Sequence, residues 1–173
     1  MIRDSGPGTR DLPWREALGA IVVLVSRILT APRTPWENDE FLFAEAVKRF
    51  DPSLYHPHPP GYPLYVLLGK IVNVAVGDPW RALVVLGIIS APIGFIALAS
   101  AFRNWIEDAD LAVTAALLYY FSASMLVHGT LALSDGPSIM FLALALLAIS
   151  KIGEAEQSVG AAISTAEGYA GRL

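Results

Sequence analysis

The chain has 173 residues, of which 54% are hydrophobic and 16% are charged. Its mean hydropathy is +0.51, and its apolar content exceeds the roughly 45–50% usual for soluble domains. The formal net charge of −4, without a basic block, argues against nucleic-acid binding. The absence of cysteine excludes disulfides, thiolate metal sites and a cysteine nucleophile. The composition therefore predicts an integral membrane protein.

The first apolar segment covers 17–26 and follows three arginines, at positions 3, 10 and 15. A cleaved signal peptide has a similar beginning, but Arg27 and Arg33 follow here without a clean small-residue cleavage site. We therefore expect an uncleaved membrane span near 16–35, interrupted by Arg27.

The most polar long stretch comes next, at 35–70, and contains an amphipathic pattern. Phe43, Ala46, Val47 and Phe50 follow the i, i+3, i+4, i+7 spacing of one helix face. Asn38 is the expected N-cap, and an Asp-Pro pair at 51–52 marks the end. This pattern predicts a helix that lies on the membrane surface.

The segment 62–76 is apolar but short for a membrane crossing, and it contains Lys70 and Asn73. If it lies in the interface, then the N-terminal arginines, Arg103 and Lys151 all fall on the cytoplasmic side, as the positive-inside rule requires. If it crosses, Arg103 faces outward. Charges at 48–49 lie in the outer loop in either case, but we favour the interfacial placement.

Three further spans are expected near 81–102, 111–128 and 135–151. Residues 82–102 carry no charge and are long enough, at about 1.5 Å per residue, to cross a ~30 Å hydrocarbon layer. The predicted fold is an all-α integral membrane bundle of about four transmembrane helices, with interfacial helices in the first outer loop and both termini inside. Residues 1–152 form the membrane module, and 153–173 form a polar, mobile cytoplasmic tail.

Acidic and histidine side chains gather in the outer loop. A carboxylate at Glu37, Asp39 or Glu40 could act as a general base or bind a divalent cation, although helix capping also explains these acids. His56 and His58 cannot share a helix face because prolines separate them, but either could contact a phosphate or a metal. Solvated surface histidines are the alternative.

Asp135 stands at the start of the fourth expected span. It is either a helix-start residue beside Gly136-Pro137 or a site group that faces the same side as Asp39. The predicted topology places both aspartates on one side and therefore favours the second role. His128, in the same outer region, is a weaker candidate.

Three segments together resemble the GT-C membrane glycosyltransferases, such as protein O-mannosyltransferases and aminoarabinose transferases. The segments are "NDEFLFAEAVKRF", "HPHPPGYPLYVLLGK" and "ALSDGPSIMFLALALLAI". Asp39-Glu40 matches the acidic pair of the family's first loop, and His58-Pro59-Pro60 matches its His-Pro-Pro motif. Gly61 departs from the leucine often found there. The resemblance covers about residues 14–152.

The resemblance implies transfer of a sugar from a polyprenyl-phosphate donor to an extracytoplasmic acceptor, at a bacterial or archaeal plasma membrane. Asp39 would be the catalytic base, and Glu40, His58 and Asp135 would bind substrate. His58 would lie near the donor phosphate, and Asp135 would shape the site or a position for a divalent metal.

Members of that family have more spans than this chain. We therefore expect the chain to be a portion of such an enzyme, completed by further membrane helices of the same or another chain. A non-enzymatic membrane subunit or a transporter-like module is the open alternative. A charged residue inside the later spans would favour transport, but 82–102 and 111–127 contain none.

Overall fold

The computed structural model describes residues 13–170, and these residues form helices and loops without a β-strand. The helices are α1 (Pro13–Thr30), α2 (Asn38–Lys48), the short 3-10 helix η1 (Pro52–Leu54), α3 (Pro63–Val76), α4 (Pro79–Trp105), α5 (Ala109–Tyr120), α6 (Ala123–His128) and α7 (Asp135–Ala170). The predicted all-α class is confirmed.

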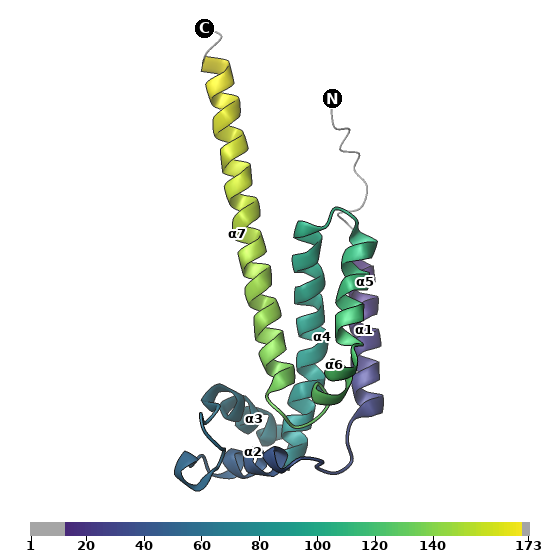
Figure 1. Ribbon diagram of the computed structural model, residues 1–173, viewed down its shortest axis with the longest axis vertical. Coiled ribbons are helices and arrows are strands. Elements are labelled where there is room, and N and C mark those ends of the chain that lie inside the picture. The colour runs from purple at the N-terminus through teal and green to yellow at the C-terminus, as the bar shows by residue number, and fades with distance from the viewer. Residues whose placement is uncertain (1–12, 171–173) are drawn as a thin grey trace.

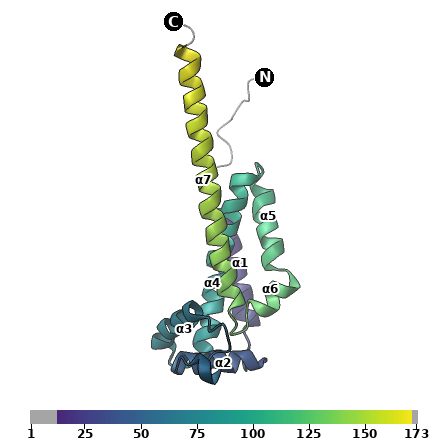
Figure 2. The same ribbon diagram turned by 60° about the vertical axis from the view of Figure 1, so that its left-hand side comes forward.

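Two groups of helices differ in direction. Figure 1 shows α1, α4, α5 and α7 running along the long axis, whereas α2 and α3 lie at one end of this bundle. The same arrangement is visible after rotation in Figure 2, where α6 also lies toward the end that carries α2 and α3. We call this end, formed by α2, α3, α6 and the first turn of α7, the loop end. The start of α1 and the far part of α7 lie at the opposite end (Figure 1).

Two helical segments within residues 13–170 are long and apolar enough to cross a membrane. They are α4 and the Asp135–Gly160 part of α7, whereas α3 and α5 are apolar but shorter. Length and composition thus give two candidate membrane spans, and the arrangement with four spans stays a prediction.

Several expected helix ends were wrong. The first helix ends at Thr30 rather than near 35, because prolines at 32 and 35 disfavour helical backbone in the residues before them. The expected span 111–128 is divided, since α5 ends at Tyr120 and α6 begins at Ala123. The Ser122 hydroxyl accepts a hydrogen bond from the Met125 N–H and so caps the new helix.

The C-terminal segment also differs from expectation. Residues 153–170, predicted as a mobile tail, continue α7 as a helix to Ala170. The segment lacks proline and is rich in alanine and glutamate, which have high helix propensity. Its last three residues, 171–173, lie outside the described part of the chain.

One cluster of buried side chains joins the long helices. Phe95 of α4 and Tyr120 of α5 are almost fully buried, and their rings meet edge to face at 5.9 Å. Glycine permits this packing, because a Cβ at Gly19 would lie 2.5 Å from the Phe95 ring. Arg27, the charge within the first expected span, is fully buried, and its Nη2 donates to the Tyr120 carbonyl at 2.6 Å.

A second cluster holds α2 and α3 against the start of α4. It contains Phe43 and Val47 from α2, Tyr65 from α3 and Leu83 from α4, together with the loop 131–133. Gly69 of α3 lies so close to α4 that a Cβ there would be 2.5 Å from a Leu83 methyl carbon. Burial of this apolar surface fixes the two short helices at the loop end.

Candidate functional site

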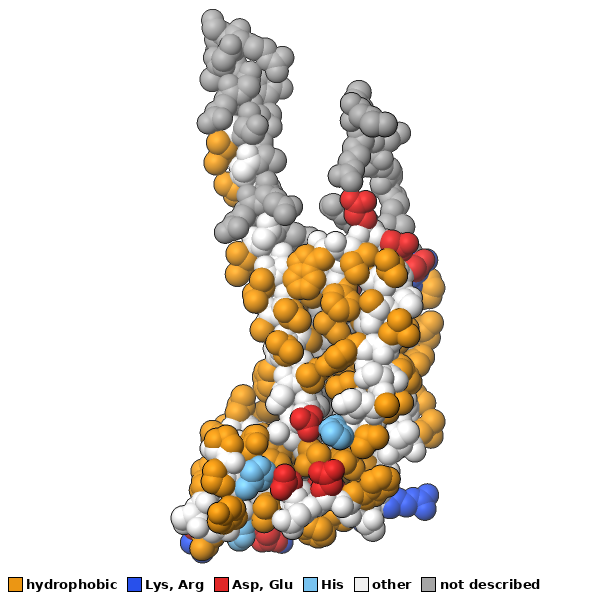
Figure 3. Space-filling model, viewed as in Figure 1, with side chains coloured by type: hydrophobic (Ala, Val, Ile, Leu, Met, Phe, Trp, Pro, Cys, Tyr) orange, Lys and Arg blue, Asp and Glu red, His pale blue; other side chains and the backbone are white. Residues whose placement is uncertain are grey.

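A cavity of about 300 Å³ opens at the loop end. It is lined by Glu37, Asp39, Phe43, His58, Tyr62, His128, Leu133, Ser134 and Asp135. Figure 3 shows acidic and histidine side chains gathered on this end of the molecule, among hydrophobic neighbours. Asp39, His58 and Asp135, three of the four site residues expected from the sequence, therefore lie around one cavity although they come from separate segments.

Asp39 lies in the first turn of α2. The helix begins at Asn38 with Glu37 as its N-cap, so the expected cap at Asn38 was one position too late. The Asp39 side chain is about half exposed (49%), and its Oδ1 lies 3.8 Å from Nδ1 of His58. That separation is longer than a hydrogen bond, and the buried Nδ1 atom of His58 has no hydrogen-bond partner within the described residues.

Glu40, the neighbour of Asp39, is fully buried and does not line the cavity. One of its carboxylate oxygens accepts from the N–H groups of Trp36 at 2.7 Å and Glu37 at 3.2 Å. The other accepts from Nε1 of Trp80 at 2.9 Å and from the N–H of Ala132 at 3.0 Å. The carboxylate thus connects the start of α2 to α4 and to the loop before α7. We interpret Glu40 as a positioning residue rather than a ligand of the substrate.

Aromatic rings form one wall of the cavity. The Phe43 ring lies 5.4 Å from the His58 ring and 5.2 Å from the Tyr62 ring, and His58 and Tyr62 are themselves 5.2 Å apart. Tyr65 supports Phe43 in an edge-to-face contact at 4.9 Å. Sequence reasoning missed Tyr62, because a single tyrosine after a proline cluster carries no periodic signal.

Tyr65 also carries a buried polar group near the cavity. Its side chain is 5% exposed, and its hydroxyl has no hydrogen-bond partner within the described residues. Burial raises the pKa of Tyr65 well above its ordinary value, and the negative charges of Glu40 and Asp135 raise it further. The phenol is therefore neutral at physiological pH.

The connection between α6 and α7 contributes to the site. His128 is the last residue of α6, and Asp135 is the first residue of α7, so a short loop joins two cavity-lining residues. His56, the other loop histidine, does not line the cavity. Its backbone instead pairs with Asp51 in an isolated antiparallel bridge.

Within the part of the chain that the structure describes, no three His, Asp or Glu side chains converge as they would to hold a metal ion.

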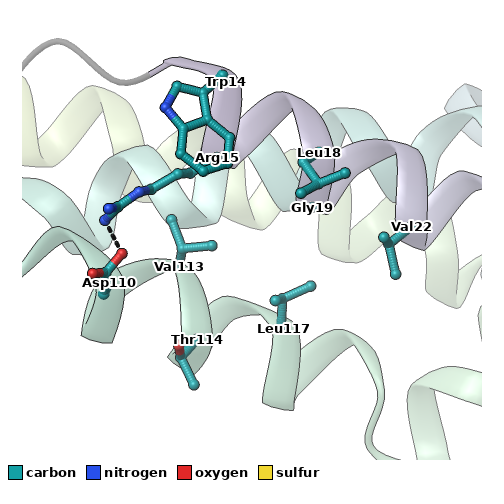
Figure 4. A pocket seen from close by; sticks show the side chains of 9 residues that line it. All are labelled: Trp14, Arg15, Leu18, Gly19, Val22, Asp110, Val113, Thr114 and Leu117. Atoms are coloured by element: carbon teal, nitrogen blue, oxygen red, sulfur yellow. Dashed lines mark hydrogen bonds and ion pairs between the residues drawn. The ribbon is translucent and has the colours of Figure 1, made fainter.

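A second hollow, of about 370 Å³, lies between α1 and α5 near the opposite end of the bundle. Figure 4 shows its mainly apolar lining, including Leu18, Val22 and Leu117, and the ion pair between Arg15 and Asp110 at one end. This lining lacks the combination of carboxylates and imidazoles found at the loop end. The loop-end cavity is therefore the candidate functional site.

Comparison of the chain with models of protein families, with curated proteins and with solved structures finds no match.

Proposed function

We propose that the chain forms the donor- and acceptor-binding part of a membrane glycosyltransferase that uses a polyprenyl-phosphate sugar. The observation that carries the proposal is the convergence of Asp39, His58 and Asp135 on one cavity at the loop end. The resemblance of the motifs around these residues to GT-C enzymes supports the same reaction.

The location of the cavity suits a lipid-linked donor. It lies beside α2 and α3, the two short helices that the sequence predicts at a membrane surface. A donor with a long polyprenyl tail would keep the tail in the bilayer and present its sugar and phosphate at that surface. In this proposal the loop end faces the outside of a bacterial or archaeal plasma membrane.

The proposed chemistry assigns different roles to Asp39 and His58. Asp39 takes the proton from an acceptor hydroxyl as the acceptor oxygen bonds to the anomeric carbon of the sugar. The bond from that carbon to the phosphate oxygen breaks, and polyprenyl phosphate leaves with the bonding electrons. The His58 imidazole donates a hydrogen bond to the phosphate, and Asp135 orients the sugar or the acceptor.

Asp39 is better suited to act as the base than Glu40. Four hydrogen bonds occupy the buried Glu40 carboxylate, whereas Asp39 is half exposed and lines the cavity. A base must reach the proton that it removes, and only the Asp39 carboxylate of this pair meets that requirement.

The test is sugar transfer in membranes that contain the chain together with its native partners, supplied with radiolabelled polyprenyl-phosphate sugars. Asp39→Asn keeps the size of the side chain but removes the base, so transfer should fall by about 10²–10⁴-fold. Glu45→Gln is the matched control, because Glu45 lies in the same helix, has a partly exposed side chain that pairs with Lys48 at 2.7 Å, and does not line the cavity. Equal turnover by Asp39→Asn and the control would leave Asp39 with a helix-start role alone.

A further inference from the structure

Tyr62, the residue directly before α3, has a backbone conformation that favours glycine. Its φ is 42° and its ψ is 51°, in the left-handed region. A residue with a Cβ is sterically disfavoured there. The chain could avoid this cost with glycine, as it does at Gly61, where φ is 96°. A tyrosine at position 62 therefore places an aromatic ring where glycine would be easier to accommodate.

The Tyr62 ring has a defined place in the candidate site. It lines the cavity, and it makes edge contacts with the Phe43 ring at an interplanar angle of 85° and with the His58 ring at 60°. Phe43 is in turn fixed from behind by Tyr65, at 89°. The ring thus belongs to a supported aromatic wall rather than to a mobile surface side chain.

The chemistry of this wall matches a sugar ring. A sugar has an apolar face of C–H groups and hydroxyls at its edge, so it suits a site that combines an aromatic surface with a few hydrogen-bond acceptors. Asp39 and Asp135 provide carboxylate acceptors in the same cavity. The lining includes no Lys or Arg, so apart from the two histidines its groups are better suited to the sugar than to the phosphate of the donor.

We propose that the Tyr62 ring is the platform against which the sugar of the lipid-linked substrate packs, with Asp39 and Asp135 accepting hydrogen bonds from its hydroxyls. This inference rests on the proposed function and adds a binding residue to it.

The chain contains a natural control for this inference. Tyr55 is the other residue besides glycine with positive φ in the described part of the chain, at 59°. Its side chain is 61% exposed and does not line the cavity. The same substitution at Tyr55 and Tyr62 therefore carries a similar backbone cost, but only the one at position 62 removes a ring from the cavity.

The experiment compares binding of polyprenyl phosphate with binding of polyprenyl phosphates that carry glucose, mannose or arabinose. The full chain and its variants are placed in lipid nanodiscs, and the ratio of the dissociation constants with and without sugar is measured. Wild type should bind at least one sugar-bearing lipid more tightly than the sugar-free lipid. Tyr62→Phe and Tyr55→Leu should keep that preference. In Tyr62→Leu, the preference for the sugar-bearing lipid, expressed as the ratio of the two dissociation constants, should be about three- to tenfold weaker.

A measurement on the unsubstituted chain protects the test against a poorly folded Tyr62→Leu variant. The ring signals of Tyr62 in an NMR spectrum, assigned from their absence in Tyr62→Phe, should shift with the preferred sugar-bearing lipid and not with polyprenyl phosphate. If wild type prefers a sugar-bearing lipid but Tyr62→Leu keeps the preference, or if the ring signals do not shift, the platform is overturned and the proposed function stands. If wild type prefers none of the three sugar-bearing lipids, both proposals fail.

Discussion

Asp39 and Glu40 are neighbours in the chain but have opposite environments. Asp39 is half exposed at the cavity, whereas Glu40 is fully buried and accepts four hydrogen bonds from three parts of the fold. The Asp39-Glu40 motif therefore contains two acids with different roles. One acid is available for chemistry, and the other holds the helix that presents it.

Glu40→Gln should destabilise the chain by about 1–3 kcal/mol. The amide replaces one carboxylate oxygen with a donor that faces other donors, and a buried donor left without an acceptor costs about 1–3 kcal/mol. Thermal unfolding in detergent measures the effect. Glu45→Gln should change it little, because exposed ion pairs contribute little to stability. Similar unfolding temperatures for the two variants would contradict the positioning role of Glu40.

Tyr65→Phe should stabilise the chain by about 1 kcal/mol at neutral pH. The hydroxyl is buried without a partner in the described residues, and a buried hydroxyl without a hydrogen bond costs about 1–3 kcal/mol on the scale from protein mutations. Tyr65→Phe should therefore unfold at a higher temperature than the unsubstituted chain. Tyr55→Phe, at an exposed position, is the control.

Tyr65 should also make stability depend on alkaline pH. Burial, and next the charges of Glu40 and Asp135, raise the pKa of Tyr65 in the folded state above its value in the unfolded chain. The unfolded chain loses the proton first, so stability should fall as the pH rises above about 10. Tyr65→Phe should remove part of this decline in the free energy of unfolding. An identical decline in both proteins would mean that the phenol ionises in the folded state as readily as in water.

At the scale of elements, close packing of helices depends on small residues. Gly94 lies in the middle of α4, where a Cβ would contact Oη of Tyr120 and would lie 3.0 Å from Cα of Met140 in α7. The first contact involves a side chain, but the second involves helix backbone. Gly94 therefore sets how closely α4 approaches both α5 and α7.

Gly94→Ala should destabilise the chain by about 1–3 kcal/mol, because overpacking forces the neighbouring backbone to shift. Gly153→Ala is the matched control in α7. A Cβ at Gly153 meets nothing within 4 Å, so this variant should be neutral or more stable by up to about 1 kcal/mol. Unfolding by heat or denaturant distinguishes the two, and an unchanged Gly94→Ala protein would show that α4 and α7 can move apart without cost.

At the scale of the whole molecule, the positions of the α4–α5 loop and of the segment 62–76 bear on the membrane topology. The α4–α5 loop lies at the same end of the bundle as the start of α1, and an ion pair of 2.7 Å between Glu16 and Arg103 connects α1 to α4 there. The segment 62–76 lies across the loop end rather than alongside the long helices (Figures 1 and 2). The favoured topology, in which that segment does not cross the membrane, stays a prediction.

Single cysteines at Ser53 and Glu107 should react with an impermeant thiol reagent from opposite sides of a sealed membrane. Ser53 belongs to η1 at the loop end, and Glu107 lies in the exposed α4–α5 loop at the other end. Native cysteine is absent and gives no background. Labelling of both positions from one side would contradict the predicted topology and the outward placement of the cavity.

The sequence by itself determined the class of fold and several elements. Long apolar runs predicted α4 and the membrane part of α7, and the spacing of Phe43, Ala46 and Val47 predicted α2. These features depend on residues a few positions apart, so local periodicity is sufficient to reveal them. The motifs also identified Asp39, His58 and Asp135 as candidates, although their catalytic and binding roles stay predictions.

Only the tertiary structure decided which side chains share a space. The difference between Asp39 and Glu40 arises from contacts of Glu40 with Trp80 and Ala132, which lie 40 and 92 residues away in the chain. The position of Tyr62 depends likewise on rings from α2 and α3 that meet only after the helices pack. Such contacts follow from burial of apolar surface between distant segments, and no local pattern in the sequence encodes them.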